Sequence, residues 1–537
     1  MAPPEVGALE YHERTKHSPQ SVRTSGHRLD FDNKPTPYKV YEALSTRSLS
    51  ESVRPPQQSA LTAVAEPAPD GDPTVVPDRE TLATLCYYAA GITKRIDVRG
   101  GTRLFRAASA TGALYHVDLY VVCGDLEDET VAEGVDLEAG VYHFDPRTLS
   151  LDVLREGDYR GVLADASAHD GVAAAPLSIV ATSTWWRNAW KYRERTYRHA
   201  FWDSGTILAN LLAVAHALDL RAEVVTGFAD APVVDLLGID PEREAPLELV
   251  AIGAGSGVPD PPSVAPIDPR TAPLSPNEKT FPLIHEAWSA SVLADGRSAD
   301  RWRTDRPAES IGTRGGDDGE RIPLDPVDHE TASSRPLHAT IRRRGSCREY
   351  RREPISFRKL STVLDRAVRG VPMDVRREDD PPLSFAEPYL VVNAVSGLES
   401  GAYRYHPAEG ELELLGRDEF RQEAGHLALD QRLGADAAVC VYFLTDLESV
   451  VDAFGDRGYR VAQLEAALTA GRLYLATYAH RTLGGTGLTF YDDAVTDFFA
   501  SQVDRTSASQ PSSQFDRDAF ARTPMFLYTM GRPANVT

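Results

Sequence analysis

Apolar residues along the chain follow two periods, and they change from one to the other in the same order twice. Alternating stretches such as GVYHFDPRTLSLDVL, from Gly140, and GAYRYHPAEGELELL, from Gly401, are typical of two strands joined by a turn. Long apolar stretches after Lys191 and after Ala453 have the spacing of buried helices. In each half the pattern predicts a strand, a strand-turn-strand, a helix, a strand, a long helix, a strand, a short helix and a strand. Since strict βαβ alternation is absent, we expect an α+β fold.

The two halves also resemble each other residue by residue. The segments that begin at Lys191 and Ala453 align without a gap, and the same offset continues through the next strand. The matched pairs are Arg195 with Arg457, Tyr197 with Tyr459, Arg198 with Arg460, Phe228 with Phe490, and Asp230 with Asp492. Such a repeat is either two stacked copies that bury a shared face, or a fused pseudo-dimer with a site between the copies. A division of site-like residues between the halves favours the second reading.

Proline-, serine- and charge-rich stretches separate these halves and predict the domain limits. Residues 1–79 read as an N-terminal extension and linker, and residues 80–255 as the first domain. Residues 256–335 read as a second linker, in which Phe281 to Val292 has the spacing of one amphipathic helix. Residues 336–537 read as the second domain.

The charge of the chain narrows its partners and its environment. The net charge of −22 opposes binding to nucleic acid or to anionic membranes, because both need a basic surface. The chain has seven lysines, fifty arginines and many carboxylates. This composition favours adaptation to a salt-rich, halophilic environment, and the alternative is that the acidic surface serves only to keep the protein soluble. The four cysteines form no CxxC pair, so neither a metal cluster nor a disulfide framework is expected. No signal peptide or membrane span is apparent in the sequence, and we expect a cytoplasmic protein.

An arginine-rich motif opens the second domain. Arg344, Ser346 and Arg348 form Arg-x-Ser-x-Arg, in which two guanidinium groups flank a hydroxyl and can hold a phosphate. Arginine runs are more often solvated faces, so this motif carries little on its own.

A run of small residues marks the first domain at SATGALY, which begins at Ser109. Small residues let the backbone approach a flat ligand closely, although a plain turn before a core strand explains the run equally well. The run contains Ser109, Ala110, Gly112, Ala113 and Leu114 as candidate ligand contacts.

A glycine-rich turn stands late in the second domain, at LGGTGLTFYDD. Its backbone N–H groups can face an acceptor, but the GxGxxG spacing of a dinucleotide site is absent. The candidate residues of this turn are Gly485, Thr486, Gly487, Leu488 and Thr489.

Together, in this order, these motifs resemble the flavin-dependent nitroreductase superfamily, and more narrowly its SagB/ThcOx branch. The resemblance also draws on KYRERTYR from Lys191 and on EYHERTKHS from Glu10, and it covers most of residues 8–535. It implies tandem nitroreductase-like domains that bind FMN between two like units. One departure is Ala108, which stands where the family has a proline.

The resemblance divides the motifs between the halves. It implies that the second domain supplies the phosphate-binding Arg-x-Ser-x-Arg, the glycine turn from Gly485 to Thr489 near flavin N5, and Arg532 near the C-terminus. It implies that the first domain supplies SATGALY. The first domain has no clear Arg-x-Ser-x-Arg and the second has no Ser-x-x-Gly loop. We therefore expect one complete FMN site per chain and one degenerate site. In the SagB/ThcOx branch a Lys-Tyr pair is implicated in catalysis, and Lys191 and Tyr192 match it. A neighbouring ammonium is expected to lower the tyrosine pKa, and the alternative is an exposed helix start.

Three functions remain open from the sequence. The first is an FMN-dependent dehydrogenase of the SagB type that acts on a small heterocyclic or peptide-derived substrate, with or without a cyclodehydratase partner. The second is an NAD(P)H-dependent reductase of nitro, quinone or enone compounds. The third is a catalytically silent scaffold, and further oligomerisation of the pseudo-dimer is open.

Overall fold

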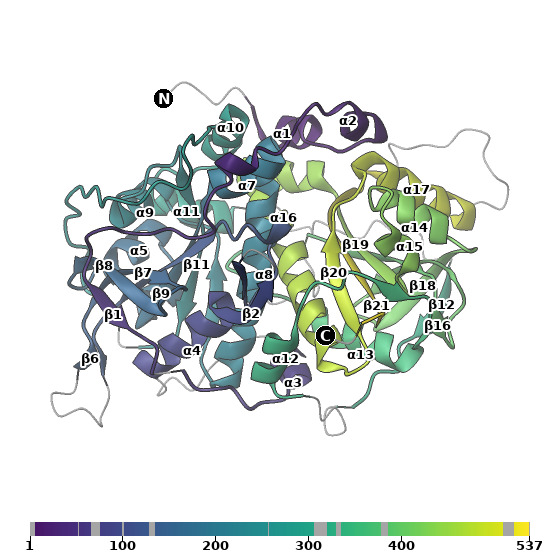
Figure 1. Ribbon diagram of the computed structural model, residues 1–537, viewed down its shortest axis with the longest axis horizontal. Coiled ribbons are helices and arrows are strands. Elements are labelled where there is room, and N and C mark those ends of the chain that lie inside the picture. Colours follow the sequence, from purple (N-terminus) through teal and green to yellow (C-terminus); the bar gives the residue numbers. More distant parts are fainter. Residues whose placement is uncertain are drawn as a thin grey trace.

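The computed structural model describes most of the chain. The described residues are 6–51, 53–65, 76–98, 101–127, 135–255, 257–305, 319–328, 335–376, 385–507 and 520–535. They form two mixed domains that lie side by side, with the first half of the sequence on one side and the second half on the other (Figure 1). The predicted α+β class with tandem domains is therefore confirmed.

Each domain is built on one antiparallel sheet. The first sheet has the order β1-β8-β7-β4-β9-β11-β10, and the second has the order β12-β18-β17-β15-β19-β21-β13, with β20 paired to β21. The strands of the first sheet are β1 (Thr46–Ser48), β4 (Val117–Cys123), β7 (Gly140–Asp145), β8 (Ser150–Glu156), β9 (Leu177–Thr184), β10 (Ala222–Val225) and β11 (Glu244–Ile252). Those of the second are β12 (Glu320–Pro323), β13 (Tyr350–Arg351), β15 (Glu387–Val392), β17 (Gly401–His406), β18 (Glu411–Arg417), β19 (Val439–Thr445), β20 (Gly484–Leu488) and β21 (Thr523–Pro533).

The two sheets repeat the same strand order. The path β8-β7-β4-β9-β11-β10 of the first domain corresponds to β18-β17-β15-β19-β21-β20 of the second. Strands β4, β9 and β19 are buried along their whole length, as expected where helices cover both faces. The predicted order of elements in each half is confirmed, and the sequence repeat is a repeat of architecture.

Helices surround the sheets and join the domains. The first domain carries α4 (Arg79–Ala90), α5 (Arg160–Ser167), α6 (Asp170–Ala174), α7 (Trp185–Tyr192), α8 (Thr196–Ala217) and α9 (Asp230–Leu237). The second carries α12 (Leu337–Arg343), α13 (Phe357–Ala367), α14 (Arg421–Leu427), α15 (Arg432–Asp436), α16 (Leu447–Ala479) and α17 (Asp492–Ser507). The segments outside the repeat contribute α1 (Ala8–Arg14), α2 (Pro19–Thr24), α3 (Ala60–Ala65), α10 (Pro282–Ala290) and α11 (Gly296–Thr304).

The long helices α8 and α16 form the contact between the domains, and Figure 1 shows them together at the centre. Glycines allow them to come close. A Cβ atom on Gly205 would lie 2.6 Å from the backbone nitrogen of Leu468, and one on Gly471 would lie 2.5 Å from the Cβ of Ala209. Larger side chains at these two positions would therefore push the domains apart.

The predicted linkers contain ordered structure. The helix expected over Phe281 to Val292 is α10, but α11 and the strand β12 also lie between residues 256 and 335. In the N-terminal extension, β1 pairs with β8 as the edge of the first sheet. The strands β1 and β12 thus extend the two sheets, and the domain limits given above remain a prediction.

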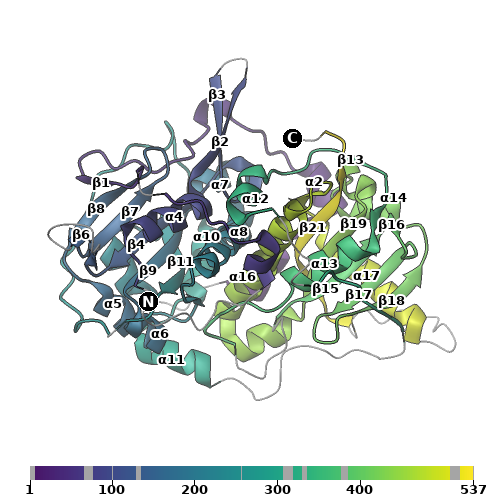
Figure 2. The same cartoon turned by 90° about the horizontal axis from the view of Figure 1, so that it is seen from below.

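Smaller elements complete the fold. They are the strands β2 (Ile92–Val98), β3 (Gly101–Arg106), β5 (Leu126–Glu127), β6 (Val135–Leu137), β14 (Ile355–Ser356) and β16 (Val395–Ser396), and the 3-10 turns η1 (Phe31–Asn33), η2 (Thr111–Ala113) and η3 (Arg193–Arg195). The hairpin of β2 and β3 projects from the body of the protein (Figure 2). Among the residues described, no helix is both long and apolar enough to cross a membrane.

Candidate functional site

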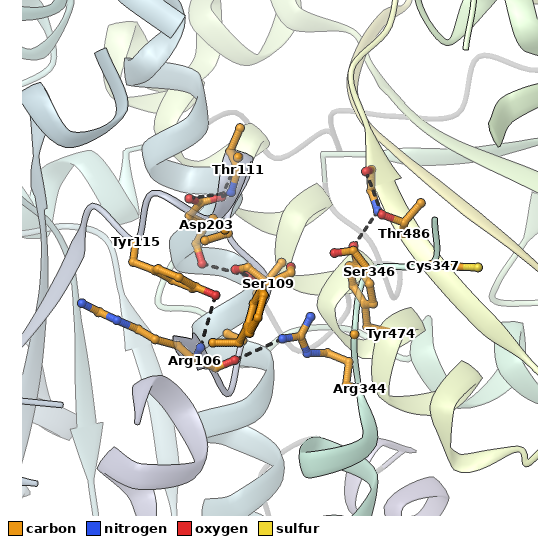
Figure 3. Close-up of a pocket in the computed structure, with 18 of the residues that line it drawn as sticks. Arg106, Ser109, Thr111, Tyr115, Asp203, Arg344, Ser346, Cys347, Tyr474 and Thr486 are labelled. Atoms are coloured by element: carbon orange, nitrogen blue, oxygen red, sulfur yellow. Dashed lines mark hydrogen bonds between the residues drawn. The ribbon is translucent and has the colours of Figure 1, made fainter. Parts of the chain in front are cut away.

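A cavity of about 1280 Å³ lies between the two domains, and both line it. The first domain contributes η2, the β2–β3 hairpin, the C-terminal end of α7 and part of one face of α8. The second domain contributes the loop after α12, the strand β20 and one face of α16. In Figure 3 the two groups of side chains face each other across this cavity. A site shared between the repeats is what the fused pseudo-dimer reading predicted.

The wall of the first domain is a short loop in an unusual conformation. Gly112, Ala113 and Tyr115 have φ angles of 65°, 54° and 49°, a left-handed region that is costly for the two residues with side chains. Asp203 on α8 holds the loop by accepting hydrogen bonds from the backbone N–H of Thr111 at 2.8 Å and from its hydroxyl at 2.7 Å. The loop is therefore fixed by the long helix that packs against the other domain.

Gly112 is the point of closest approach in this loop. A Cβ atom there would lie 2.9 Å from the phenol oxygen of Tyr192. The missing side chain thus leaves the loop backbone beside the candidate catalytic phenol, and the predicted use of small residues fits this geometry.

The Arg-x-Ser-x-Arg loop forms the opposite wall. Arg344 crosses the interface and donates from Nε to the carbonyl of Ala107 at 2.9 Å, and its guanidinium lies over the ring of Tyr474. The backbone N–H of Cys347 donates to the carbonyl of Gly485 at 3.0 Å, which ties the loop to β20. Arg344 therefore links the domains as well as lining the cavity.

The glycine turn is held tightly from behind. The backbone N–H of Gly487 donates to the phenol oxygen of Tyr474 at 2.6 Å. A Cβ atom on Gly485 would lie 1.9 Å from the phenol oxygen of Tyr528, so only glycine fits at this position. One of the amides expected to face a ligand is thus already bonded within the protein.

Lys191 and Tyr192 end α7 at the edge of the cavity. The ammonium of Lys191 lies over the ring face of Tyr192, 4.9 Å from the ring centroid. The expectation that the ammonium lowers the pKa of the phenol is wrong. Burial, with a contribution from the Asp203 carboxylate, raises the pKa of Tyr192 well above its ordinary value, although the charge of Arg348 opposes this. The phenol is therefore protonated at neutral pH.

The pKa of Lys191 is shifted in the opposite direction. Burial lowers it, and the positive charges of Arg348 and Lys34 lower it further. The pair thus combines a phenol that keeps its proton with an amine that loses its proton more readily than an exposed lysine.

Positive charge dominates the cavity in a chain of net charge −22. Its lining contains only two carboxylates among the described residues, Asp203 and Glu349. The cationic residues are Lys34, Lys94, Arg103, Arg106, Lys191, Arg343, Arg344 and Arg348. Such a concentration of cations is suited to an anionic ligand.

Most of the residues predicted for the site line this cavity. They are Ser109, Ala110, Gly112, Ala113, Lys191, Tyr192, Arg344, Ser346, Arg348, Thr486, Gly487, Leu488 and Thr489. Three others lie elsewhere. Leu114 is buried in the core, Gly485 packs behind the turn, and Arg532 makes a half-exposed ion pair with Glu353 at 3.2 Å.

Several residues of the site were not predicted. Asp203 and Tyr474 lie within the two aligned long helices and Lys34 lies in the N-terminal segment, and none of them belongs to a motif predicted to bind a ligand. A signal for Asp203 existed, because the offset that aligns the two halves places it on Glu465. Glu465 accepts from the backbone N–H groups of Phe385 and Ala386 at 2.8 and 2.9 Å, so the same anchor recurs in the second domain.

The equivalent position on the other side of the pseudo-dimer is filled by the chain itself. The segment that contains Asp374 lies along the edge of β10, where Val224 N–H donates to Pro372 and Asp374 N–H donates to Val224. The buried carboxylate of Asp374 accepts from the backbone N–H groups of Thr226 and Gly227, both at 2.8 Å. This internal occupant supports the expectation that the second site is degenerate.

Comparisons of the sequence with known proteins match part of the chain. The family model described as "Nitroreductase family" matches residues 72–254. A candidate nitroreductase of Methanocaldococcus jannaschii is 32% identical over 143 residues, which are 26% of this chain and 71% of that protein. The microcin B17-processing protein McbC of Escherichia coli is 25% identical over 138 residues, which are 25% of this chain and 49% of that protein.

One solved structure matches the chain over its full length. The crystal structure of a candidate nitroreductase from Anabaena variabilis has a TM-score of 0.73 and 27% identity, and covers 98% of this chain and 99% of its own. The tandem arrangement is therefore shared with another protein.

Proposed function

Because this chain belongs to the nitroreductase family of oxidoreductases, we propose that it is an FMN-dependent dehydrogenase of the SagB/ThcOx type. Its substrate is a small heterocyclic or peptide-derived compound. The observation that carries the proposal is the cavity itself, where SATGALY, Arg-x-Ser-x-Arg, the glycine turn and the Lys-Tyr pair come together from two domains. The similarity to the microcin B17-processing protein McbC supports a peptide-derived substrate.

The residues of the cavity fit such a cofactor. Arg344, Ser346 and Arg348 offer cations and a hydroxyl for a phosphate, and Gly112 keeps the opposite wall free of a side chain. The cavity is larger than the roughly 300–1,000 Å³ of an ordinary small-molecule site, so it has room for a cofactor and a substrate together. When bound, FMN would supply the transfer of a hydride at its N5 atom.

Lys191 and Tyr192 have different roles in the proposed reaction. A substrate that is oxidised by loss of a hydride also loses a proton, which needs an acceptor. The amine of Lys191, with its lowered pKa, is the acceptor, and the protonated phenol of Tyr192 orients the substrate by donating a hydrogen bond. Asp203 keeps the loop that carries Gly112 in place beside the phenol.

Absorbance spectroscopy of the purified protein tests the proposal. A flavin band near about 450 nm that remains through gel filtration is expected. Protein that is colourless and gains no such band when FMN is added would be the silent scaffold.

Rapid mixing with NAD(P)H separates the two enzymatic readings. A dehydrogenase of the proposed type keeps its flavin oxidised when NAD(P)H is the sole addition. Bleaching within seconds would instead assign the protein as a reductase of nitro, quinone or enone compounds.

A further inference from the structure

The mouth of the cavity has a cation that none of the described groups neutralises. Lys34, just after η1, makes no ion pair or side-chain hydrogen bond with another described residue, and its ammonium lies 5.9 Å from the ring centroid of Trp190. It is close enough to Lys191 to lower the pKa of that amine. Lys34 is exposed, and a cation at this cavity with no carboxylate of the described residues paired to it is suited to an anionic ligand.

The cofactor's phosphate does not account for this cation. The proposed function assigns the phosphate to Arg344, Ser346 and Arg348 on the second domain. Lys34 lies on the N-terminal segment, which contacts the end of α7 through Trp190 and Asp30, since the indole N–H donates to the Asp30 carbonyl at 2.8 Å.

An apolar surface lies next to Lys34. Phe31 is 70% exposed, the most exposed large apolar side chain in the described part of the chain, and its ring meets Trp190 edge to face with centroids 5.6 Å apart. A large exposed aromatic group beside a cation is suited to a ligand with an apolar body and one negative end.

We propose that Lys34, which lines the cavity, and Phe31, which lies on the adjoining surface against the buried Trp190, form a substrate subsite for a carboxylate joined to an apolar or aromatic group. This inference rests on the proposed function, because it places the subsite beside the Lys-Tyr pair that acts on the same molecule. Lys34 holds the carboxylate, and Phe31 covers the apolar part.

Isothermal titration of the FMN-loaded protein with 4-nitrobenzoate and with its neutral analogue 4-nitrobenzamide tests the subsite. We expect the acid to bind about tenfold more tightly than the amide at low salt, and the preference to weaken as salt is raised. Equal binding of the two probes would overturn the proposal.

Two substitutions locate the effect. Lys34→Gln should abolish the preference for the acid over the amide. Phe31→Ser should weaken the binding of both probes and leave the preference for the acid unchanged. Lys279→Gln, at an exposed lysine outside the cavity, is the matched control and should change neither. A preference that survives Lys34→Gln would contradict the assignment.

Two further probes identify the source of the carboxylate, and the flavin content is a separate readout. Acetyl-Phe-Gly-Gly carries a C-terminal carboxylate, and acetyl-Phe-Asp-Gly-amide carries a side-chain carboxylate. The peptide that binds more tightly than its uncharged analogue identifies the kind of carboxylate that the subsite binds. If neither peptide binds more tightly than its uncharged analogue, the subsite accepts only small acids. The flavin absorbance recorded before each titration reports on the proposed function independently of the subsite.

Discussion

Arg198 of the first domain donates a hydrogen bond to the carboxylate of Asp492 in the second domain at 2.6 Å, and both side chains are fully buried. The repeat produces the equivalent contact related by pseudo-two-fold symmetry, in which Arg460 of the second domain donates to Asp230 of the first at 2.9 Å. Each half therefore holds the other by equivalent residues, as in a two-fold dimer. These residues are structural, and the cavity lies to one side of them.

Tyr197 and Tyr459 extend this relationship. Their rings are stacked, with centroids 6.2 Å apart and planes inclined by 8°. The phenylalanines belong to the same interface, because the guanidinium of Arg195 lies over the ring of Phe490 and that of Arg457 lies over the ring of Phe228. All five residue pairs that reveal the repeat in the sequence thus lie in contacts that join the two domains.

Asp492→Asn should destabilise the protein by about 3–5 kcal/mol at neutral pH, because it leaves two buried guanidinium groups without their carboxylate. Burial alone would raise the pKa of Asp492, but Arg195 and Arg198 outweigh it and hold that pKa well below the ordinary value. This stability is present above the unfolded pKa of about 3.9 and is lost as the pH falls below it. Urea unfolding at pH 7 and pH 3 measures the difference, which should shrink at the lower pH.

The control for this measurement is Glu10→Gln, which breaks an exposed ion pair with Arg14. It should cost less than about 1 kcal/mol. A loss for Asp492→Asn as small as that of the control would contradict the structural role of the buried pairs.

Glu248→Gln should make the protein more stable, and increasingly so as the pH rises from about 4.5 to 8. Burial raises the pKa of Glu248 to about 8, although its hydrogen bond from Ser204 opposes this. The folded protein keeps this proton while the unfolded chain loses it, so the wild-type stability falls across that window. Thermal unfolding of the wild type and the variant between these two pH values measures the difference in stability. A difference that does not change with pH would contradict the prediction.

Gly112→Ala should weaken FMN binding by about tenfold, because the added methyl group would meet the phenol of Tyr192 in a backbone conformation that costs alanine about 1 kcal/mol. The matched control is Gly410→Ala, which shares a φ angle near that of Gly112 but has open space at the Cβ position. Flavin fluorescence titration measures both variants. Equal affinity of the two would remove the loop from the binding site.

Tyr192→Phe should retain FMN but slow turnover by about 10²–10³-fold, because the substrate loses its hydrogen-bond donor. The raised pKa of the phenol predicts no loss of activity from its ionisation up to pH 10. Activity should instead increase with pH as Lys191 loses its proton, at a pH below the ordinary value for lysine, and Lys191→Gln should abolish this increase. Unchanged turnover in Tyr192→Phe would remove the pair from the mechanism.

The sequence predicts the fold well because a repeat is visible without coordinates. The alternating strands, the long helices after Lys191 and Ala453, and the shared offset follow from local periodicity, and the structure has them in the predicted order. The sequence predicts a linker where the structure has α11 and β12. Short segments rich in charge gain their structure only from the surfaces that they contact, which the local pattern does not reveal.

The candidate site could be predicted only in part, for a physical reason. Motifs such as SATGALY are local, whereas Asp203, Tyr474 and Lys34 reach the cavity through packing between domains and through the path of the N-terminal segment. The direction of the Tyr192 pKa could not be inferred from the adjacent lysine either, because it depends on the burial of the phenol.

Equilibrium binding of FMN is the most direct test of the central claim, that the cavity between the domains is one complete flavin site. We expect one FMN per chain in the wild type, and binding weakened about tenfold or more by Arg348→Gln, which lines the cavity. Arg342→Gln, at an exposed arginine outside the lining, should bind as the wild type does. Two FMN per chain, or equal affinity in both variants, would contradict the account.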